Sequence, residues 1–211
     1  GGGTAVFETR LELPLAKMQL VNHAPTQGTL GIQDAMIIRS GDPHRSTLYH
    51  RMARLGPGRM PRIGSNAIDT QGLKLMRDWI TAMPASGLEP VATAQAANLK
   101  NFQAGKISAL TPLLAKPENA ALLADALEGE DPEQLNIRAA RAEANGKTDP
   151  NIRDLFRRYN PHQIDNRLGA SPDAAAILAI TGKPADGKAI FFQTTTLCAT
   201  CHQVNGQGKA F

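Results

Sequence analysis

The sequence is short of cysteine, aromatic residues and long apolar runs, and each shortage excludes a class of protein. Only two of its 211 residues are cysteines, which rules out a zinc site built from four cysteines. Aromatic residues make up 4% of the chain and do not interleave with a basic patch, so we expect no nucleic-acid partner. No stretch approaches about 18 consecutive apolar residues, so we expect no membrane-spanning segment.

The rest of the composition is that of a folded chain. Apolar residues account for 42% of the sequence, which argues against disorder. The formal net charge of +4 is a mild excess that favours acidic partners without naming one. One basic cluster is expected to lie on a solvated helix face and loop. Its members are Arg51, Arg54, Arg59 and Arg62.

The spacing of apolar residues and the positions of proline and glycine predict a mainly α protein with a loop-rich N-terminal segment. Short apolar runs broken by turn formers occupy residues 1–41, and helices are predicted over 42–55 and 69–83. Small residues with proline and glycine predict a linker over 84–97. Short helices follow to the end of the chain. They are predicted over 106–115, 118–127, 132–145, 151–159, 171–180 and 184–193.

The only two cysteines stand three residues apart, and a histidine follows at once, in Leu197-Cys198-Ala199-Thr200-Cys201-His202. Cys-x-x-Cys-His is the attachment signature of c-type haem. Thiols at this spacing can reach the two vinyl groups on one porphyrin edge, and the next imidazole can bind the iron. We therefore predict that Cys198 and Cys201 hold haem c and that His202 ligates its iron. Two alternatives stay open, a redox dithiol or disulfide and a zinc site with a second ligand pair.

The surroundings of this motif resemble c-type cytochromes. Gly187-Lys188-Ala189-Ile190-Phe191-Phe192 is similar to the first helix of class I cytochromes c, and Gly206-Gln207-Gly208 to the small-residue loop under the haem. Residues from about 150 to 211 resemble the haem-binding domain at the C-terminus of large secreted proteins of planctomycetes and Verrucomicrobia. The resemblance implies electron transfer with a redox partner protein or a fused dehydrogenase module. It also implies export to the periplasm or the cell surface.

A second half-site is expected near the N-terminus. The run Gly56-Pro57-Gly58-Arg59-Met60-Pro61 cannot join either flanking helix, because it holds two glycines and two prolines. A Met-Pro on an irregular loop before a last helix resembles the distal side of c-type domains. This implies that Met60 points inward and ligates iron, and that Trp79 packs on the porphyrin edge. The alternative is that Met60 is ordinary core or loop filler and Trp79 a core residue.

These patterns divide the chain into three parts. Residues 1–84 would be the distal part of one cytochrome c-like domain, 85–170 a helical connector, and 171–211 the proximal part of a second such domain. Every methionine lies at or before Met83, so a distal methionine for the second domain is missing. We also expect the chain to be a fragment at both ends, so that the absence of a signal sequence says little about export.

Several side chains of the N-terminal helices are assigned by their spacing alone. Leu75, Trp79 and Met83 recur along one face of the second helix, which we expect to be its apolar face. Met52 and Met76 are predicted to face the core. His44 and His50 are predicted to be exposed. None of these last four side chains is predicted to bind haem.

Two further functions are consistent with the same residues. A peroxidase-like haem enzyme with an open sixth iron position would recruit the arginines between 51 and 62. A helical interaction module over residues 98–170 would make the haem incidental. No acid–base or nucleophilic pair is evident, so we expect an electron-transfer module rather than a catalyst by itself.

Overall fold

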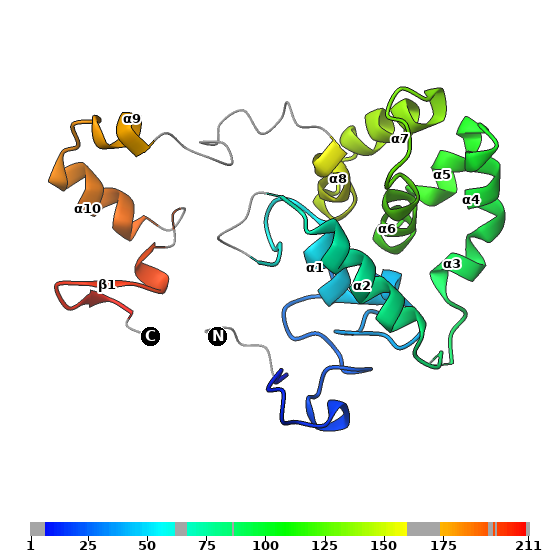
Figure 1. Ribbon diagram of the computed structural model, residues 1–211, viewed down its shortest axis with the longest axis horizontal. Helices are drawn as coiled ribbons and strands as arrows, with labels where there is room; N and C mark the ends of the chain where they lie inside the picture. Colours follow the sequence, from blue (N-terminus) through cyan, green and yellow to red (C-terminus); the bar gives the residue numbers. More distant parts are fainter. Residues whose placement is uncertain are drawn as a thin grey trace. The chain divides into compact units, whose positions relative to one another are not determined.

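The computed structural model describes residues 7–61, 67–85, 87–159, 174–193, 196 and 198–209. The chain forms two compact units, Ala5–Asn166 and a second one made of Arg167–Phe211 with Gly1–Thr4. Helices dominate the described residues, and the only sheet among them is a two-stranded hairpin (Figure 1). The prediction of a mainly α fold is therefore confirmed. None of the described helices has the length and apolar character needed to cross a membrane.

The large unit opens with a loop-rich segment, as predicted. It holds two 3-10 turns, η1 (Leu15–Lys17) and η2 (Pro43–Arg45), and isolated parallel bridges. Helix α1 (Thr47–Ala53) follows η2, so the predicted helix over 42–55 is interrupted. The interruption is at Ser46, whose backbone is extended because its hydroxyl accepts from the Arg39 amide at 2.8 Å and donates to the Asp42 carbonyl at 2.9 Å.

Helix α2 (Thr70–Thr81) turns a different face to the core from the predicted one. Leu73 and Ile80 are buried and Met76 is partly buried against the core. Leu75 is 72% exposed and Trp79 is 38% exposed, so the predicted apolar face is wrong for these two residues, whereas Met83 packs against the core. Both sets of residues follow a helical period, and the sequence alone does not say which one the neighbouring helices cover.

Buried ion pairing explains why part of the basic cluster is not on a solvated face. Arg54 and Asp154 have side chains that are 4% and 0% exposed, with Nη2 and Oδ2 3.1 Å apart. Arg59 is also buried, whereas Arg62 lies outside the described residues. The partner of Arg54 is 100 residues away, which a local pattern does not reveal.

The remaining helices of the large unit are short and closely packed. The predicted linker over 84–97 is wrong from Val91 onward, because two helices start there and Val91 itself is buried. The elements are α3 (Val91–Ala94), α4 (Ala96–Gln103), η3 (Ile107–Ala109), α5 (Leu110–Leu113), α6 (Pro117–Ala126), α7 (Leu135–Asn145), α8 (Pro150–Phe156) and η4 (Arg157–Tyr159).

Helix α6 lies at the centre of this unit. Every residue from Pro117 to Ala124 is buried, and α3, α5, α8 and η2 all contact the helix. The core joins Ile38 and Tyr49 from the N-terminal part to Leu123 and Phe156. The segments predicted as a half-domain and a connector thus share one core. Each large apolar side chain buried in it contributes roughly 1.5–3 kcal/mol.

The small unit consists of α9 (Ala174–Leu178), α10 (Pro184–Phe192), the 3-10 turn η6 (Cys198–Thr200) and the strands β1 (Gln203–Val204) and β2 (Gln207–Gly208). Pro184 stands in the first turn of α10, where a missing amide hydrogen costs nothing. The predicted start of the preceding helix, at residues 171–173, lies outside the described residues. None of the described side chains of this unit is buried.

Candidate functional site

The predicted haem-binding residues lie on one tight turn. Cys198 opens η6, and its carbonyl accepts from the Cys201 amide at 3.2 Å and the His202 amide at 2.9 Å. These bonds place the two cysteines and His202 on consecutive positions of a single turn. Both cysteines are free thiols; Cys198 is half-buried, and Cys201 and His202 are exposed. The structure therefore brings together the three residues that the sequence motif singles out.

The hairpin that follows folds back onto this turn. Strands β1 and β2 are antiparallel, and Asn205 and Gly206 both have positive φ in the tight turn between them. The Lys209 amide donates to the Ala199 carbonyl at 3.0 Å. A Cβ atom on Gly208 would lie 2.2 Å from the His202 carbonyl oxygen. Only glycine allows this approach, so Gly208 holds the hairpin against the Cys-x-x-Cys-His turn.

A groove of about 520 Å³ runs between α10 and the hairpin. Phe191 and Phe192 line it and meet edge to face, with ring centroids 5.0 Å apart. Phe192 is 39% exposed and Val204, on the opposite side, is 48% exposed. Lys188, Asn205 and Gln207 also line the groove, whereas Cys198, Cys201 and His202 are not among its lining residues.

Haem and zinc place different demands on these three residues. In the part of the chain that is described, no three His, Cys, Asp or Glu side chains gather as a metal ion would require, and this includes Cys198, Cys201 and His202. A structural zinc site needs its ligands to converge on one point. Haem attachment would instead distribute the three residues, with the thiols on the porphyrin edge and the imidazole on the iron.

The predicted distal residues are both at the surface of the large unit. Met60 is 40% exposed. Its loop is held by Arg51, whose carbonyl accepts from the Met60 amide at 2.8 Å and whose Nη1 donates to the Gly58 carbonyl at 2.9 Å. Trp79 is 38% exposed and does not belong to the core. Iron ligation by Met60 stays a prediction.

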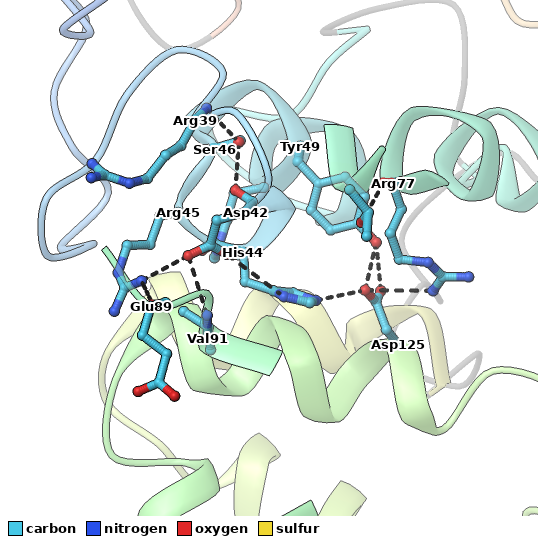
Figure 2. Close-up of polar contacts among 12 residues, drawn as sticks. Arg39, Asp42, His44, Arg45, Ser46, Tyr49, Arg77, Glu89, Val91 and Asp125 are labelled. Atoms are coloured by element: carbon cyan, nitrogen blue, oxygen red, sulfur yellow. Dashed lines mark hydrogen bonds and ion pairs between the residues drawn. The ribbon is translucent and has the colours of Figure 1, made fainter. Parts of the chain in front are cut away.

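A second cluster of functional groups, which the sequence analysis missed, lies inside the large unit (Figure 2). The His44 ring places Nε2 3.0 Å from Asp125 Oδ2. Tyr49 donates its hydroxyl to the same carboxylate at 2.7 Å, and Arg77 Nη1 lies 3.5 Å from it. On the other side, His44 Nδ1 is 4.0 Å from Asp42 Oδ1. The cluster joins η2, α1, α2 and α6.

The charge state of this cluster follows from its contacts. Burial raises the pKa of Asp125, but the hydrogen bonds and charges of His44, Tyr49 and Arg77 outweigh it and hold that pKa below the usual range. Burial, together with the charge of Asp125, raises the pKa of Tyr49. Asp125 is therefore a carboxylate that accepts, and Tyr49 a neutral phenol that donates.

The prediction that His44 and His50 are exposed is wrong, since they are 3% and 1% exposed. Burial lowers the pKa of His50 from 6.5 to about 4, against the opposing effect of its hydrogen bond to the His44 carbonyl. That bond is 2.9 Å long and runs to Nε2, which therefore carries the hydrogen. Asp125 lies 81 residues from His44 in the sequence, so no local sequence pattern could predict their contact.

Comparison of the chain with known protein families, with curated proteins and with solved structures found no match.

Proposed function

We propose that the chain binds haem c through Cys198, Cys201 and His202 and transfers electrons as part of a larger exported redox protein. The observation that carries the proposal is the exposed Cys-x-x-Cys-His turn, backed by the hairpin and accompanied by the groove along α10. The redox partner would be a separate protein or a fused dehydrogenase module. Export follows from the chemistry, because thioether attachment needs reduced thiols and haem delivered outside the cytoplasm.

The chain's own residues have distinct roles in this proposal. Cys198 and Cys201 would each hold the haem through a thioether bond, with the thiol hydrogen passing to the vinyl group that the sulfur joins. The His202 imidazole would supply a nitrogen ligand to the iron. Phe191, Phe192 and Val204 would offer apolar surface to the macrocycle. When bound, the iron takes up and releases one electron, at a potential that its ligands help to set.

Attachment is tested by producing the full chain with a periplasmic cytochrome maturation system. The protein is expected to keep its colour through acid–acetone extraction and denaturing electrophoresis. Cys198→Ala and Cys201→Ala each weaken this retention, and the double variant abolishes it. Thr200→Ala changes the same turn without removing a thiol and retains the colour. Free extraction of haem from the unmodified chain contradicts the proposal and favours a redox dithiol.

Carbon monoxide distinguishes electron transfer from the chemistry of a haem enzyme. An iron with two protein ligands resists carbon monoxide, whereas an open sixth position binds it at once and shifts the visible spectrum of the reduced protein. Met60 is proposed to ligate the iron of a different haem domain from that of His202, so Met60→Ala is tested, with Met52→Ala as the matched control, in a chain extended upstream of Gly1 to carry a further Cys-x-x-Cys-His motif. Binding of carbon monoxide that appears only with Met60→Ala supports Met60 as the ligand; the same result with Met52→Ala argues against it.

A further inference from the structure

Three arginine side chains converge on one buried carboxylate in the large unit. Asp154, on α8, has a side chain that is 0% exposed. Its Oδ2 lies 3.1 Å from Arg54 Nη2, and its Oδ1 lies 3.3 Å from Arg153 Nη2 and 3.7 Å from Arg157 Nη1. Arginine is always charged in proteins, so one carboxylate leaves two of these three positive charges uncompensated.

The backbone of the loop after α1 fits closely around this cluster. The Leu55 amide donates to the Asp154 carbonyl at 3.1 Å. Gly56 follows with a φ of 112°, and a Cβ atom on it would lie 2.7 Å from Asp154 Oδ2 and 3.0 Å from Arg157 Nη1. A larger residue at this position would displace the carboxylate or the guanidinium group. The position of Arg157 Nη1 is therefore set by the loop as well as by Asp154.

The three arginines differ in what they can reach. Arg54 has a side chain that is 4% exposed, and it donates to two oxygen atoms at the start of α8 as well as to Asp154. Arg153 and Arg157 have side chains that are 39% and 34% exposed, and among the described residues Asp154 is their only ion-pair partner. Asp149, the nearest other acidic residue in the sequence, caps α8 instead. Arg153 and Arg157 therefore keep N–H donors that a ligand in solution can reach.

We propose that Arg153 and Arg157 bind a phosphate group, either free or in a phosphate monoester. A phosphate monoester carries a charge of about −1.5 to −2 at pH 7 and three acceptor oxygens, which matches the uncompensated charge. Both guanidinium groups approach the same oxygen of Asp154, so one tetrahedral anion can accept from both. A carboxylate ligand would compensate only one charge. The partial negative charge at the end of α8 opposes an anion, but it is smaller than one full charge. The proposal is independent of haem binding.

The test titrates the full chain with inorganic phosphate at pH 7 and constant ionic strength, and follows backbone amides by NMR. The Leu55 amide reports on the site because it donates to Asp154. Phosphate is expected to bind saturably, to move this signal, and to bind at least about tenfold more tightly than acetate, which brings one charge. Phosphoserine identifies the source of the phosphate. Binding as tight as that of inorganic phosphate supports a monoester as ligand, and weaker binding supports the free ion.

Variants locate the binding. Arg153→Gln and Arg157→Gln each remove one charge from a partly exposed side chain and are expected to weaken phosphate binding about tenfold. Arg157→Lys keeps the charge beside Asp154, so it tests the site even if a glutamine variant fails to fold; it loses the guanidinium fork and binds phosphate more weakly than the unmodified chain. Lys100→Gln removes one charge from an exposed position of α4 and has no effect. The proposal is overturned if phosphate binds no more tightly than acetate, if the arginine variants bind it normally, or if Lys100→Gln weakens binding as much as they do.

Discussion

The two units of the chain differ in how they bury their side chains. In Ala5–Asn166 the side chains of Tyr49, Leu123 and Phe156 are fully enclosed. In the small unit none of the described side chains is buried, and Leu178 is 84% exposed. The large unit is therefore stabilised by its own apolar packing. The small unit is organised by a few backbone contacts around the Cys-x-x-Cys-His turn, and the proposed haem would supply the apolar partner that its exposed residues need.

Truncating a buried leucine is expected to lower the free energy of unfolding more than any other change, and to destabilise only the large unit. Leu123→Ala lowers the free energy of unfolding by about 3–5 kcal/mol, because it leaves a cavity that the central helix α6 cannot close. Leu178→Ala, in the small unit, changes it by less than about 0.5 kcal/mol. Urea denaturation followed by circular dichroism measures both values. Equal losses would contradict the contrast between the units.

Acid is expected to weaken the large unit through His50. Its pKa is lowered from 6.5 to about 4 in the folded chain, so between these values the unfolded chain binds a proton that the folded chain does not. The free energy of unfolding therefore falls by about 3 kcal/mol as the pH drops from 6.5 to 4. Unfolding at a series of pH values, with His50→Gln as control, measures this slope.

Protonation of Asp125 affects the free energy of unfolding in a lower pH range than protonation of His50. Its pKa lies below the usual 3.8, so the stability that its ionised form contributes is present above pH 3.8 and is lost as the pH falls further, through its folded pKa. A slope between pH 6.5 and 4 that persists in His50→Gln would contradict the assignment to His50.

Two methionines of the large unit differ in burial, so substituting each of them compares the loss of core packing with the loss of an exposed side chain. Met52 packs against the core, as predicted, whereas Met60 is 40% exposed. Met52→Ala is expected to lower the free energy of unfolding by about 2 kcal/mol, and Met60→Ala by no more than about 0.5 kcal/mol. Thermal unfolding of the two variants side by side gives the comparison. A larger loss for Met60→Ala would show that its loop contributes to the core.

The smallest effect on global stability is expected from the hairpin of the small unit. Gly208→Ala places a Cβ atom against the His202 carbonyl at a residue with φ of 100°. The local opening free energy should fall by about 1 kcal/mol or more, and the Lys209 amide, which bonds to Ala199, should exchange faster. Gly182→Ala, where a Cβ meets nothing within 4 Å, is the control. Unchanged exchange in Gly208→Ala would contradict the role of Gly208.

Local signals in the sequence predicted much of this fold. Proline at the first turn located the starts of α6, α8 and α10, and Asp149 caps α8 by accepting from the Asn151 amide at 2.8 Å. The Cys-x-x-Cys-His motif is equally local, so the structure gathers its residues on one turn. Structural features that depend only on residues close together in the sequence can be predicted from the spacing of apolar residues and from the positions of proline and glycine.

Features decided by distant residues were not predicted. The burial of His44 depends on Asp125, and the burial of Arg54 depends on Asp154. The inward face of α2 depends on which of two helical stripes the other helices cover. Helix α3 and the first two residues of α4 were predicted to be part of a linker, because their residues are mostly small.

The long reach of the contacts around Asp125 has a consequence for how the chain matures during synthesis. His44 must wait for a partner 81 residues further on, and Arg54 for one 100 residues further on. At 5–20 residues per second, a ribosome needs roughly 4–16 s to deliver the partner of His44. Throughout that interval the N-terminal segment is without the residues that enclose it. Chaperones that bind unfinished chains could protect this segment during that period. The period ends only when helix α8, which carries the partner of Arg54, has emerged from the ribosome.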